Sequence, residues 1–565
     1  PRYSSSAASD VYKRQLPGCN IPAAAVATRC VPFRTLSSSL RHGLNKLCRE
    51  SHPRKATDSN AYLPTCPWGN GITMTKLRVE PSAHTDGRLR FLTVMIAISS
   101  MTHMISFQWW TELLTGQIVL GTTLLIFLFP GSTIALAIFL ASSIFHWFSL
   151  VPRVPNHIFF EMLVHLTLLS SLGLSLLKSR QQNGSETSGG RSSSFANTAF
   201  NLARPYMITE LIILYLFTVI HKLNYDFFDP EVSCAVSMHH DVAASVPGIP
   251  EGPWTWWPTI IGTILIELAI PMLFIARRTR SFGLFLGIGF HLFLALHPHG
   301  GIYSFTGLLF TLYFLLLPDS AEDWLTSRLA KIPRLGRIGF KCVVLTGFFL
   351  TVYLQTVAGR EGKPFEDLNA IGFMAWLPLA LLIAGVYILA LIFGPRNEHD
   401  AKVSSDRSNN LTEPKLGRLL WIFPILVLIN GSSPYLGLKT TTAFSMFSNL
   451  RTEGGQSNHF FLSNIGLFKY QEDLVEVVDS NDAQFWSLIN SGDLIPWFEF
   501  RRMASMSERD DAAITCIRNG KHLVLKRDDP SDESQEAFTP HPWLADKFLH
   551  FRSIRPFDQP QKCCW

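Results

Sequence analysis

The stretch YMITELIILYLFTVIHKLNYDFFDP, residues 206–230, begins as a nearly unbroken apolar run and ends in a cluster of polar and charged residues. The apolar part is long enough for a helix that crosses the hydrocarbon core of a bilayer, which is about 30 Å thick and needs roughly 20 helical residues. Lys222 therefore stands where this helix leaves the membrane. Two hypotheses arise for Lys222: a cation whose side chain reaches the lipid headgroups, or a catalytic base.

The composition of the whole chain is that of a membrane protein. Of its 565 residues, 47% are hydrophobic and only 16% are charged, whereas a soluble protein carries about 25% charged residues. We therefore predict an all-α polytopic membrane bundle with a small C-terminal β-rich domain. The apolar runs predict about eleven transmembrane helices, at residues 91–110, 113–129, 132–150, 156–177, 206–223, 254–276, 281–297, 302–317, 338–358, 370–394 and 418–432.

Lys and Arg concentrate in every second loop, and basic loops stay on the cytoplasmic side of a membrane protein. The loop over residues 178–205 is basic, whereas the loop over 224–253 has five acidic residues and no Lys or Arg. We therefore expect the second loop on the exoplasmic side, with a cytoplasmic N-terminus and a lumenal or extracellular C-terminal domain. The predicted organisation is a disordered basic cytoplasmic tail (1–90), a transmembrane core (91–330), additional transmembrane helices (331–432) and the exoplasmic domain (433–565).

The C-terminal domain carries strand signals. ITCIRNGKHLVLKR, residues 514–527, has an Asn-Gly pair between two alternating runs, which predicts a β-hairpin. LIPWFEFRR, residues 494–502, is a further strand candidate. The nine cysteines contain no CxxC pair, so neither a zinc knuckle nor a redox dithiol is indicated.

Asn156 and His157 begin the span at residues 156–177, at its exoplasmic end. His157, Glu161 and His165 follow one another at spacings of four, which places them on one face of a helix. This stripe could line a cavity, and two His with a Glu could bind a metal. The alternative is that His157 caps the helix and His165 is a hydrogen-bonded buried histidine. We predict no metal site.

Lys222 can act as a base only if its pKa falls from about 10.4 towards neutrality. Burial or a charged His221 would lower the pKa of Lys222, whereas Asp226 would raise it if the helix continued by one more turn. Glu267 and His291 lie mid-span in consecutive helices. They could meet at mid-bilayer, either as a structural hydrogen bond or as part of a pocket. Glu210 is expected near water at the cytoplasmic interface.

HKLNYDFFDPEVS, residues 221–233, resembles the signature of the horizontally transferred transmembrane (HTTM) domain family, which includes the vitamin K-dependent gamma-carboxylases. In that family a Lys-Leu-Asx-x-Asp stretch closes a transmembrane helix, and KLNYD matches it. PNHIFF, residues 155–160, is similar to the family's Asn-His pair, and His291 stands at the family's histidine position. The resemblance covers about residues 91–330.

The resemblance implies a mechanism for the carboxylase branch. The lysine deprotonates a reduced naphthoquinol, which oxygen converts into a strong base that removes the γ-proton of a peptide glutamate, and the glutamate then captures CO2. Carried over, Lys222 is the base, Asn156 and His157 assist at the glutamate side, and His291, Glu267 and His221 are candidates for binding the cofactor, a reduced vitamin K-like quinol. The expected partners are membrane lipids, a lipid quinol and a peptide substrate, and no nucleic acid.

The carboxylases carry a large lumenal domain that holds the substrate propeptide, whereas about 130 residues follow the last predicted span here, so propeptide recognition does not carry over. Residues 433–462 are polar, contain glycines and are expected to lie over the exoplasmic end, either as a lid or headgroup site or as a connector packed on the membrane surface. A different class of function is therefore kept as an alternative: a non-enzymatic scaffold or transporter that binds a lipid or a partner through this segment.

Overall fold

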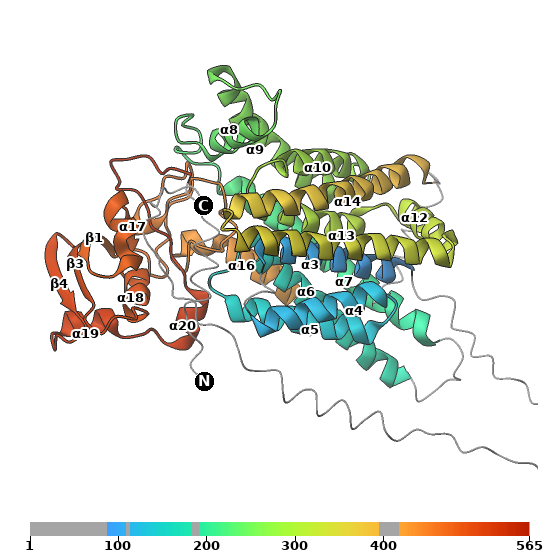
Figure 1. The fold of residues 1–565 in the computed structure, drawn as a ribbon, viewed down its shortest axis with the longest axis horizontal. Coiled ribbons are helices and arrows are strands. Elements are labelled where there is room, and N and C mark those ends of the chain that lie inside the picture. The colour runs from blue at the N-terminus through green and yellow to red at the C-terminus, as the bar shows by residue number, and fades with distance from the viewer. Residues whose placement is uncertain (1–86, 109–112, 183–190, 395–416, 564–565) are drawn as a thin grey trace, which may run out of the picture. The chain divides into compact units, whose positions relative to one another are not determined.

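The computed structural model describes residues 87–108, 113–182, 191–394 and 417–563 (Figure 1). These residues form a bundle of helices followed by a small sheet. The predicted tail over residues 1–90 lies outside the described residues except for its last four, which open the helix α3 (Gly87–Phe107).

The bundle contains the long apolar helices of a membrane protein. Apolar helices of this length satisfy all their backbone hydrogen bonds internally, as a lipid environment requires. The chain is therefore a multi-pass integral membrane protein. Within the described residues, eight helical stretches are long and apolar enough to cross a membrane: α3, α5 (Thr133–Leu150), α6 (Asn156–Gln182), α7 (Arg191–Ile220), α9 (Pro253–Ile275), α13 (Arg334–Arg360), α14 (Phe365–Phe393) and the stretch formed by η2 (Gly417–Trp421) with α16 (Ile422–Leu436).

Every one of the eleven predicted spans coincides with a helix, but eleven crossings stay a prediction. The helices α4 (Leu114–Leu128) and α10 (Arg280–Leu294) have 15 residues each, about 22 Å of helix, which is shorter than the hydrocarbon core. The helix α11 (Gly300–Tyr313), extended by η1 (Phe314–Leu316), is bent by 110° against α12 (Asp319–Lys331). Counting this bent pair as one span gives nine crossings among the described residues.

The prediction of a loop over residues 178–205 is wrong for most of these residues. The helix α6 continues to Gln182 and α7 begins at Arg191, so Glu210 lies well inside α7 rather than at its start. Its carboxylate is fully buried and accepts a hydrogen bond from Thr167 of α6 at 2.5 Å, which contradicts the expected position near water. Pro205 resembled a loop residue in the sequence but is accommodated inside the helix.

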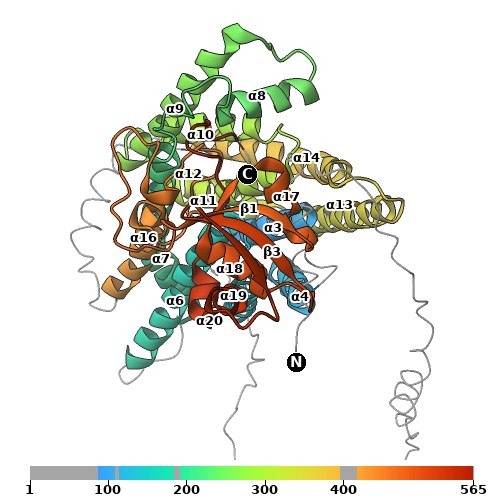
Figure 2. The ribbon, with the colours of Figure 1, turned by 90° about the vertical axis from the view of Figure 1, so that its left-hand side faces the viewer.

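The helices differ greatly in how far the protein itself encloses them. Of the 18-residue apolar stretch of α3, 83% is buried inside the protein, whereas the corresponding share in α13 is 17%. Viewed along the bundle from the side of the sheet, α13 lies at its edge (Figure 2). Exposed Leu335, Val343 and Tyr353 on α13 form an apolar surface suited to lipid. The polar groups described below are instead buried between the more enclosed helices.

The C-terminal part contains a four-stranded antiparallel sheet in the order β2-β1-β3-β4. The predicted hairpin is confirmed as β3 and β4, joined by Asn519 and Gly520, whose φ angles of 51° and 74° suit a tight hairpin turn. The strands are β1 (Leu474–Ser480), β2 (Leu494–Pro496), β3 (Ala513–Arg518) and β4 (Lys521–Lys526), and the helices among them are α17 (Trp486–Ser491), α18 (Trp497–Ser505), α19 (Asp532–Phe538) and α20 (Trp543–Phe548).

The prediction that LIPWFEFRR forms a strand is wrong beyond its first three residues. Only 494–496 form β2, and α18 begins at Trp497. Trp497, Phe500 and Ala504 are buried in the core of the sheet domain, and their spacing of three and four residues is the period of a helix. The aromatic content suggested a strand, but the helical period decides the structure.

Candidate functional site

Lys222 lies in the turn that follows α7, and its amine points into the bundle. Its Nζ is 2.7 Å from Glu267 Oε2 on α9 and donates to the carbonyl oxygen of Thr218 at 3.2 Å. Lys222 is 5% exposed and Glu267 is 9% exposed. This is the geometry of a buried ion pair between the turn after α7 and the helix α9, not that of a cation whose side chain reaches the headgroups.

The carboxylate beside Lys222 is therefore Glu267 and not Asp226. The helix ends before Asp226, whose side chain accepts hydrogen bonds from the Asn458 side chain at 2.7 Å and from the backbone N–H of Gln561 at 3.1 Å. Asp226 thus holds two distant segments of the chain against the end of α7. Its role is structural in this arrangement.

His291 of α10 completes a group of polar side chains near Lys222. Its Nε2 is 2.7 Å from the Tyr215 hydroxyl, which is 2.6 Å from the Tyr313 hydroxyl. Lys222 and His291 lie close enough to interact electrostatically. Within the described residues, the buried Nδ1 of His291 has no hydrogen-bond partner. We call Lys222, Glu267, His291, Tyr215 and Tyr313 the lysine cluster.

The side chains of the predicted pair, Asn156 and His157, contact different parts of the molecule. The Nε2 of His157 is 3.1 Å from the Ser304 hydroxyl of α11, inside the bundle. Asn156 instead accepts a hydrogen bond from the backbone N–H of Phe444 at 2.6 Å. Asn156 therefore fixes a segment that lies over the bundle, whereas His157 belongs to the interior.

The predicted stripe on α6 is part of a larger buried group. His103 of α3 has its Nδ1 2.6 Å from Ser304 Oγ and its Nε2 2.8 Å from Glu161 Oε2. His165 Nε2 lies 3.7 Å from Glu161 Oε1. All members are at most 3% exposed. We call His103, His157, Glu161, His165 and Ser304 the histidine cluster; among the described residues no three His, Cys, Asp or Glu side chains have the geometry to hold a metal ion.

One aromatic ring, that of Phe305, lies close to a histidine of each cluster. The ring centroid of Phe305 is 5.8 Å from that of His157 and 5.6 Å from that of His291. His221, the third predicted cofactor residue, is directed elsewhere and donates from Nε2 to the carbonyl oxygen of Gly431 on α16 at 3.0 Å. Phe305 thus packs near a histidine of both clusters.

Residues 437–462, the cover segment, pack over the ends of α6 and α7. Asn224 donates to the carbonyl oxygen of Ser448 at 2.6 Å and so ties this segment to the turn after α7. The segment has little regular structure and is largely buried. Four of its residues other than glycine have left-handed φ angles between 50° and 63°, a strained conformation that concentrates at functional sites: Thr442, Phe444, Phe447 and Asn449.

Lys439 in the cover segment is a buried amine that the sequence analysis missed. It is 7% exposed, and its Nζ lies 4.4 Å from the ring centroid of Phe159. Among the described residues it makes no ion pair and no side-chain hydrogen bond. Burial lowers the pKa of Lys439 from 10.5 to about 7. Only its three-dimensional surroundings distinguish it from an ordinary loop lysine.

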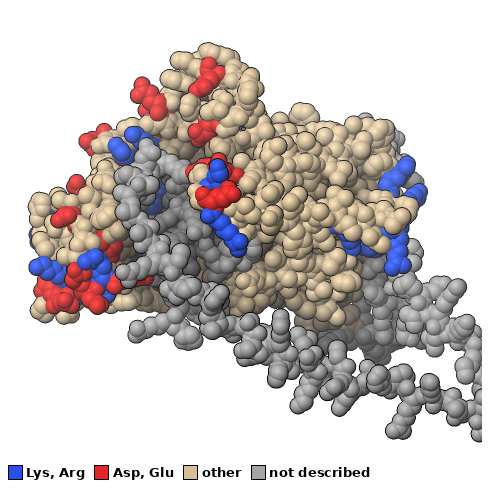
Figure 3. All heavy atoms as spheres, in the orientation of Figure 1, with Lys and Arg blue, Asp and Glu red and all other residues tan. Residues whose placement is uncertain are grey.

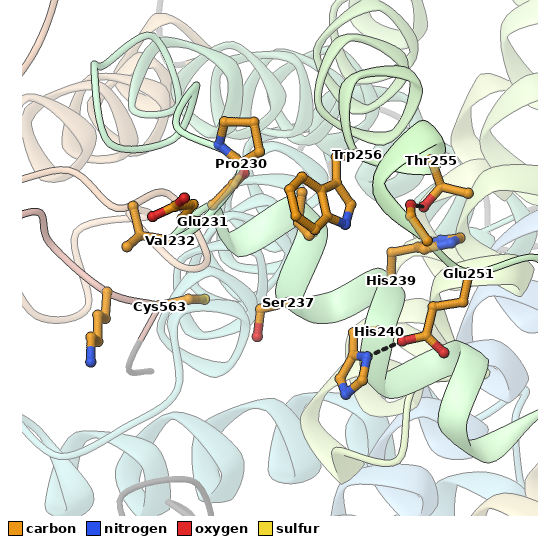
Figure 4. Close-up of a pocket in the computed structure, with 14 residues that line it drawn as sticks. Pro230, Glu231, Val232, Ser237, His239, His240, Glu251, Thr255, Trp256 and Cys563 are labelled. Atoms are coloured by element: carbon orange, nitrogen blue, oxygen red, sulfur yellow. Dashed lines mark hydrogen bonds and ion pairs between the residues drawn. The ribbon is translucent and has the colours of Figure 1, made fainter.

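A separate pocket of about 630 Å³ lies beside α8 (Cys234–Ser245) and the start of α9 (Figure 4). His240 and Glu251 face each other there and form an ion pair. Trp254 and Trp257, at the start of α9, are 67% and 52% exposed, as expected for tryptophans at a membrane–water interface. None of the six site residues predicted from the sequence lines this pocket.

A disulfide joins Cys234 to Cys563. The two cysteines are 329 residues apart, and no spacing rule connects them in the sequence. Asn449 reinforces the tie, because its side chain accepts from the backbone N–H of Cys234 at 2.8 Å and donates to the carbonyl oxygen of Gln561 at 2.8 Å. The loop after α7, the cover segment and the end of the chain are thus one connected unit.

The residues missed by the sequence analysis share a cause. His103, Ser304, Tyr215 and Tyr313 lie inside predicted spans, and their only signal is a polar side chain in a membrane-spanning segment. Their partners belong to other helices, so the pairing is set by packing. No family model matches this chain, and no curated protein or solved structure matches it.

Proposed function

We propose that this chain is a membrane enzyme of the HTTM family, carboxylase-like in its core, that uses a reduced lipid quinol with Lys222 as the base. The observation that supports this most is the buried contact of Lys222 with Glu267 at 2.7 Å. Ionisable groups inside a membrane are costly and mark functional sites in such proteins. The sequence stretch that carries the family resemblance begins directly after α7, which ends at Ile220, and contains this lysine.

The residues of the lysine cluster fit a quinol. A quinol ring carries two hydroxyls that need hydrogen-bond partners, and the hydroxyls of Tyr215 and Tyr313 would serve. The Nδ1 of His291 would serve as well, since it is a buried polar atom without a partner among the described residues. Phe274 and Phe305 pack beside these side chains and would provide apolar contacts. When bound, a reduced vitamin K-like quinol supplies a strong base by reaction with oxygen.

Glu267 gives Lys222 a way to become a base. In the ion pair Lys222 holds its proton and cannot accept another. Transfer of that proton along the 2.7 Å contact to Glu267 leaves a neutral amine and a neutral acid, and burial favours the neutral pair over two charges. The neutral amine can then accept a proton from an acidic O–H group. Glu267 is thus assigned as the residue that holds the proton of Lys222.

We place this chemistry at the exoplasmic end of the bundle. Disulfides persist in oxidising compartments outside the cytosol, and the Cys234–Cys563 disulfide joins the segment that follows Lys222 to the end of the chain. On the face shown in Figure 3, Lys and Arg gather at the end of the bundle away from the sheet domain. Basic residues stay on the cytoplasmic side, so this pattern supports an exoplasmic cover segment and sheet domain.

Oxygen consumption by the purified protein in lipid nanodiscs, supplied with a reduced naphthoquinol, tests the proposal. Lys222→Ala is expected to abolish the activity and Glu267→Gln to lower it by at least about 100-fold, as for loss of a general base. Lys469→Ala is the control, because Lys469 is 81% exposed in its side chain. Unchanged turnover in Lys222→Ala, with membrane insertion intact, would refute the assignment.

A second candidate function is non-enzymatic binding of a lipid headgroup, and the pocket beside α8 favours it. The pocket lies next to the interfacial tryptophans and carries both acidic and basic side chains. Analysis of lipids that co-purify with the protein separates the two functions. A bound quinone supports the enzyme, whereas a phospholipid that is lost in Glu251→Gln supports the binding protein.

A further inference from the structure

The short helix α20 of the sheet domain carries three large apolar side chains that are exposed. Trp543, Leu544 and Phe548 are 60%, 62% and 39% exposed. Single exposed apolar residues are normal on a soluble surface, whereas several on one short helix form a patch of the kind that contacts a partner or a membrane. The proposed role of Lys222 does not use this patch.

The helix α20 is fixed to the end of a membrane-spanning helix. The Nζ of Lys547 donates to the carbonyl oxygen of Ser149 at 2.9 Å. The last carbonyls of a helix lack partners inside the helix, so Lys547 completes the end of α5. The rings of Trp543 and Phe548 also lie near the ring of Phe148, with centroids 6.2 and 6.1 Å from it. The helix α20 therefore lies beside the last turn of α5 (Figure 1).

The end of α5 indicates the depth of α20 in the membrane. The 18 residues of α5 form about 27 Å of helix, which nearly matches a hydrocarbon core of roughly 30 Å. Exposed apolar side chains follow the length of α5, since Ile134, Ile138 and Phe145 are 73%, 48% and 64% exposed. Such a helix faces lipid. When α5 spans the core, its last turn lies at the boundary between hydrocarbon and headgroups, and α20 lies at the same level.

The apolar patch of α20 continues the lipid-facing side of α5. Phe145 and Phe148 are three residues apart, which makes them neighbours on one face of the helix, and Phe148 is the residue near which α20 packs. The charged residues of α20 are directed to the protein instead. The Oδ1 of Asp546 is 3.2 Å from Arg502 Nε of α18, and Lys547 binds the end of α5. The outer side of α20 is thus left with its apolar side chains.

A second exposed apolar segment, residues 463–470, is tied to the end of another span. Ile465 and Leu467 are 69% and 64% exposed. The backbone N–H of Ile465 donates to the carbonyl oxygen of Tyr435 at 2.9 Å, and that of Phe468 donates to Leu436 at 3.0 Å. Both acceptors belong to the last turn of α16. This segment therefore holds its apolar side chains at the end of α16, as α20 does at the end of α5.

The two spans end on the same side of the bundle. The helix α6 begins shortly after α5 ends, and Asn156 at its start binds Phe444 of the cover segment, which follows α16 directly. Aromatic side chains gather at membrane–water interfaces, and apolar helix faces can lie in the headgroup boundary. We propose that α20 and residues 463–470, together the interfacial surface, insert into the lipid leaflet on this side and hold the sheet domain against the membrane.

Spin labels measure the depth of the interfacial surface. A nitroxide is attached at Leu544→Cys, in protein whose cysteines other than Cys234 and Cys563 are replaced by serine, in phosphatidylcholine nanodiscs. Oxygen concentrates in hydrocarbon, whereas a nickel chelate stays in water. The label at 544 is expected to lose most collisions with the chelate and to gain collisions with oxygen, relative to a label at Val524→Cys. Val524 is the matched control, because it is 58% exposed and lies on β4, away from the bundle (Figure 1).

A lipid probe tests the same surface in the wild-type chain. Phosphatidylcholine with a photoactivated diazirine next to its headgroup is expected to modify the peptides that carry residues 543–548 and 463–470, but not the peptide that carries β4. Equal chelate collisions at 544 and 524, or no adduct in either segment, would overturn the proposal. Strong dipolar coupling between labels at 544 would also overturn it, because a second copy of the chain would then cover the surface. Neither measurement needs a quinol, so both are independent of the role of Lys222.

Discussion

Two lysines are buried at the same end of this molecule, and they differ in what lies beside the amine. Lys222, after α7, has the Glu267 carboxylate at 2.7 Å, whereas Lys439, in the cover segment, has the ring of Phe159 at 4.4 Å. Their exposed fractions are nearly equal, 5% and 7%. Burial is thus the same in both regions, and only the partner changes.

The difference is whether the buried amine has a counter-ion. A buried charge needs one, and Lys222 has the Glu267 carboxylate beside it. Lys439 has no counter-ion among the described residues, and burial lowers its pKa to about 7. The cover segment therefore holds an amine that loses its proton near neutral pH without any carboxylate to receive it. Three experiments test this difference between the two lysines.

The largest effect is expected from removing one member of the Lys222–Glu267 pair. Lys222→Met leaves Glu267 buried without its cation, and breaking a buried pair in this way costs about 3–5 kcal/mol. The thermal midpoint of the protein in nanodiscs measures the loss. The double variant Lys222→Met, Glu267→Met should regain most of it, because no unpaired charge remains. A double variant as unstable as the single one would show that the pair is not the stabilising unit.

Lys439→Met is expected to stabilise the protein, in contrast to Lys222→Met. The pKa of Lys439 is about 7 in the folded protein and 10.5 in the unfolded chain, so the unfolded chain binds more protons between these values and stability rises with pH there. At pH 8 the lysine therefore costs about 3 kcal/mol relative to a neutral side chain. Lys439→Met should raise the thermal midpoint at pH 8, and the gain should vanish above pH 10.5.

The control for this experiment is Lys469→Met, because the side chain of Lys469 is 81% exposed. An exposed lysine has nearly the same surroundings in both states, so its removal should give no pH-dependent gain. If Lys439→Met destabilises the protein at pH 8, the amine has a stabilising partner and the contrast with Lys222 fails.

A smaller effect is expected from loosening the segment that carries Lys439. Asn156→Ala leaves the buried N–H of Phe444 without an acceptor, which costs about 1–3 kcal/mol. Amide hydrogen exchange in residues 440–450 should become faster. Asn156→Asp keeps the accepting oxygen and should restore slow exchange. Equal exchange in the wild type and in Asn156→Ala would mean that the segment is held closed by its other contacts.

Hydropathy alone located the apolar helices of the bundle, because a lipid-crossing run needs a long apolar stretch that few other structures share. It did not locate their ends. The Arg204–Pro205 pair was taken as loop, yet both residues lie inside α7, since neighbouring helices can compensate a proline at this depth. The prediction of a strand over 494–502 was wrong for a related reason. Its aromatic residues suit a strand or a helix, and packing against the sheet favours the helix.

Some members of the candidate site were predicted, but most of their partners were not. Lys222, His157 and His291 stand out as ionisable groups in apolar runs, and the structure buries all three. Their partners could not be read from the sequence, because Glu267 reaches Lys222 through the packing of α9 on α7. In the same way, His103 meets Glu161 only because α3 passes beside α6. A sequence without an alignment holds no record of such contacts.

The bond between Cys234 and Cys563 has a consequence for biosynthesis. Cys234 follows α7, whereas Cys563 comes after every described helix of the bundle and after the sheet domain. The bond can form only when the ribosome has passed both residues, so the transmembrane helices enter the bilayer before this tie exists. During that interval the loop after α7 is not yet tied to the end of the chain.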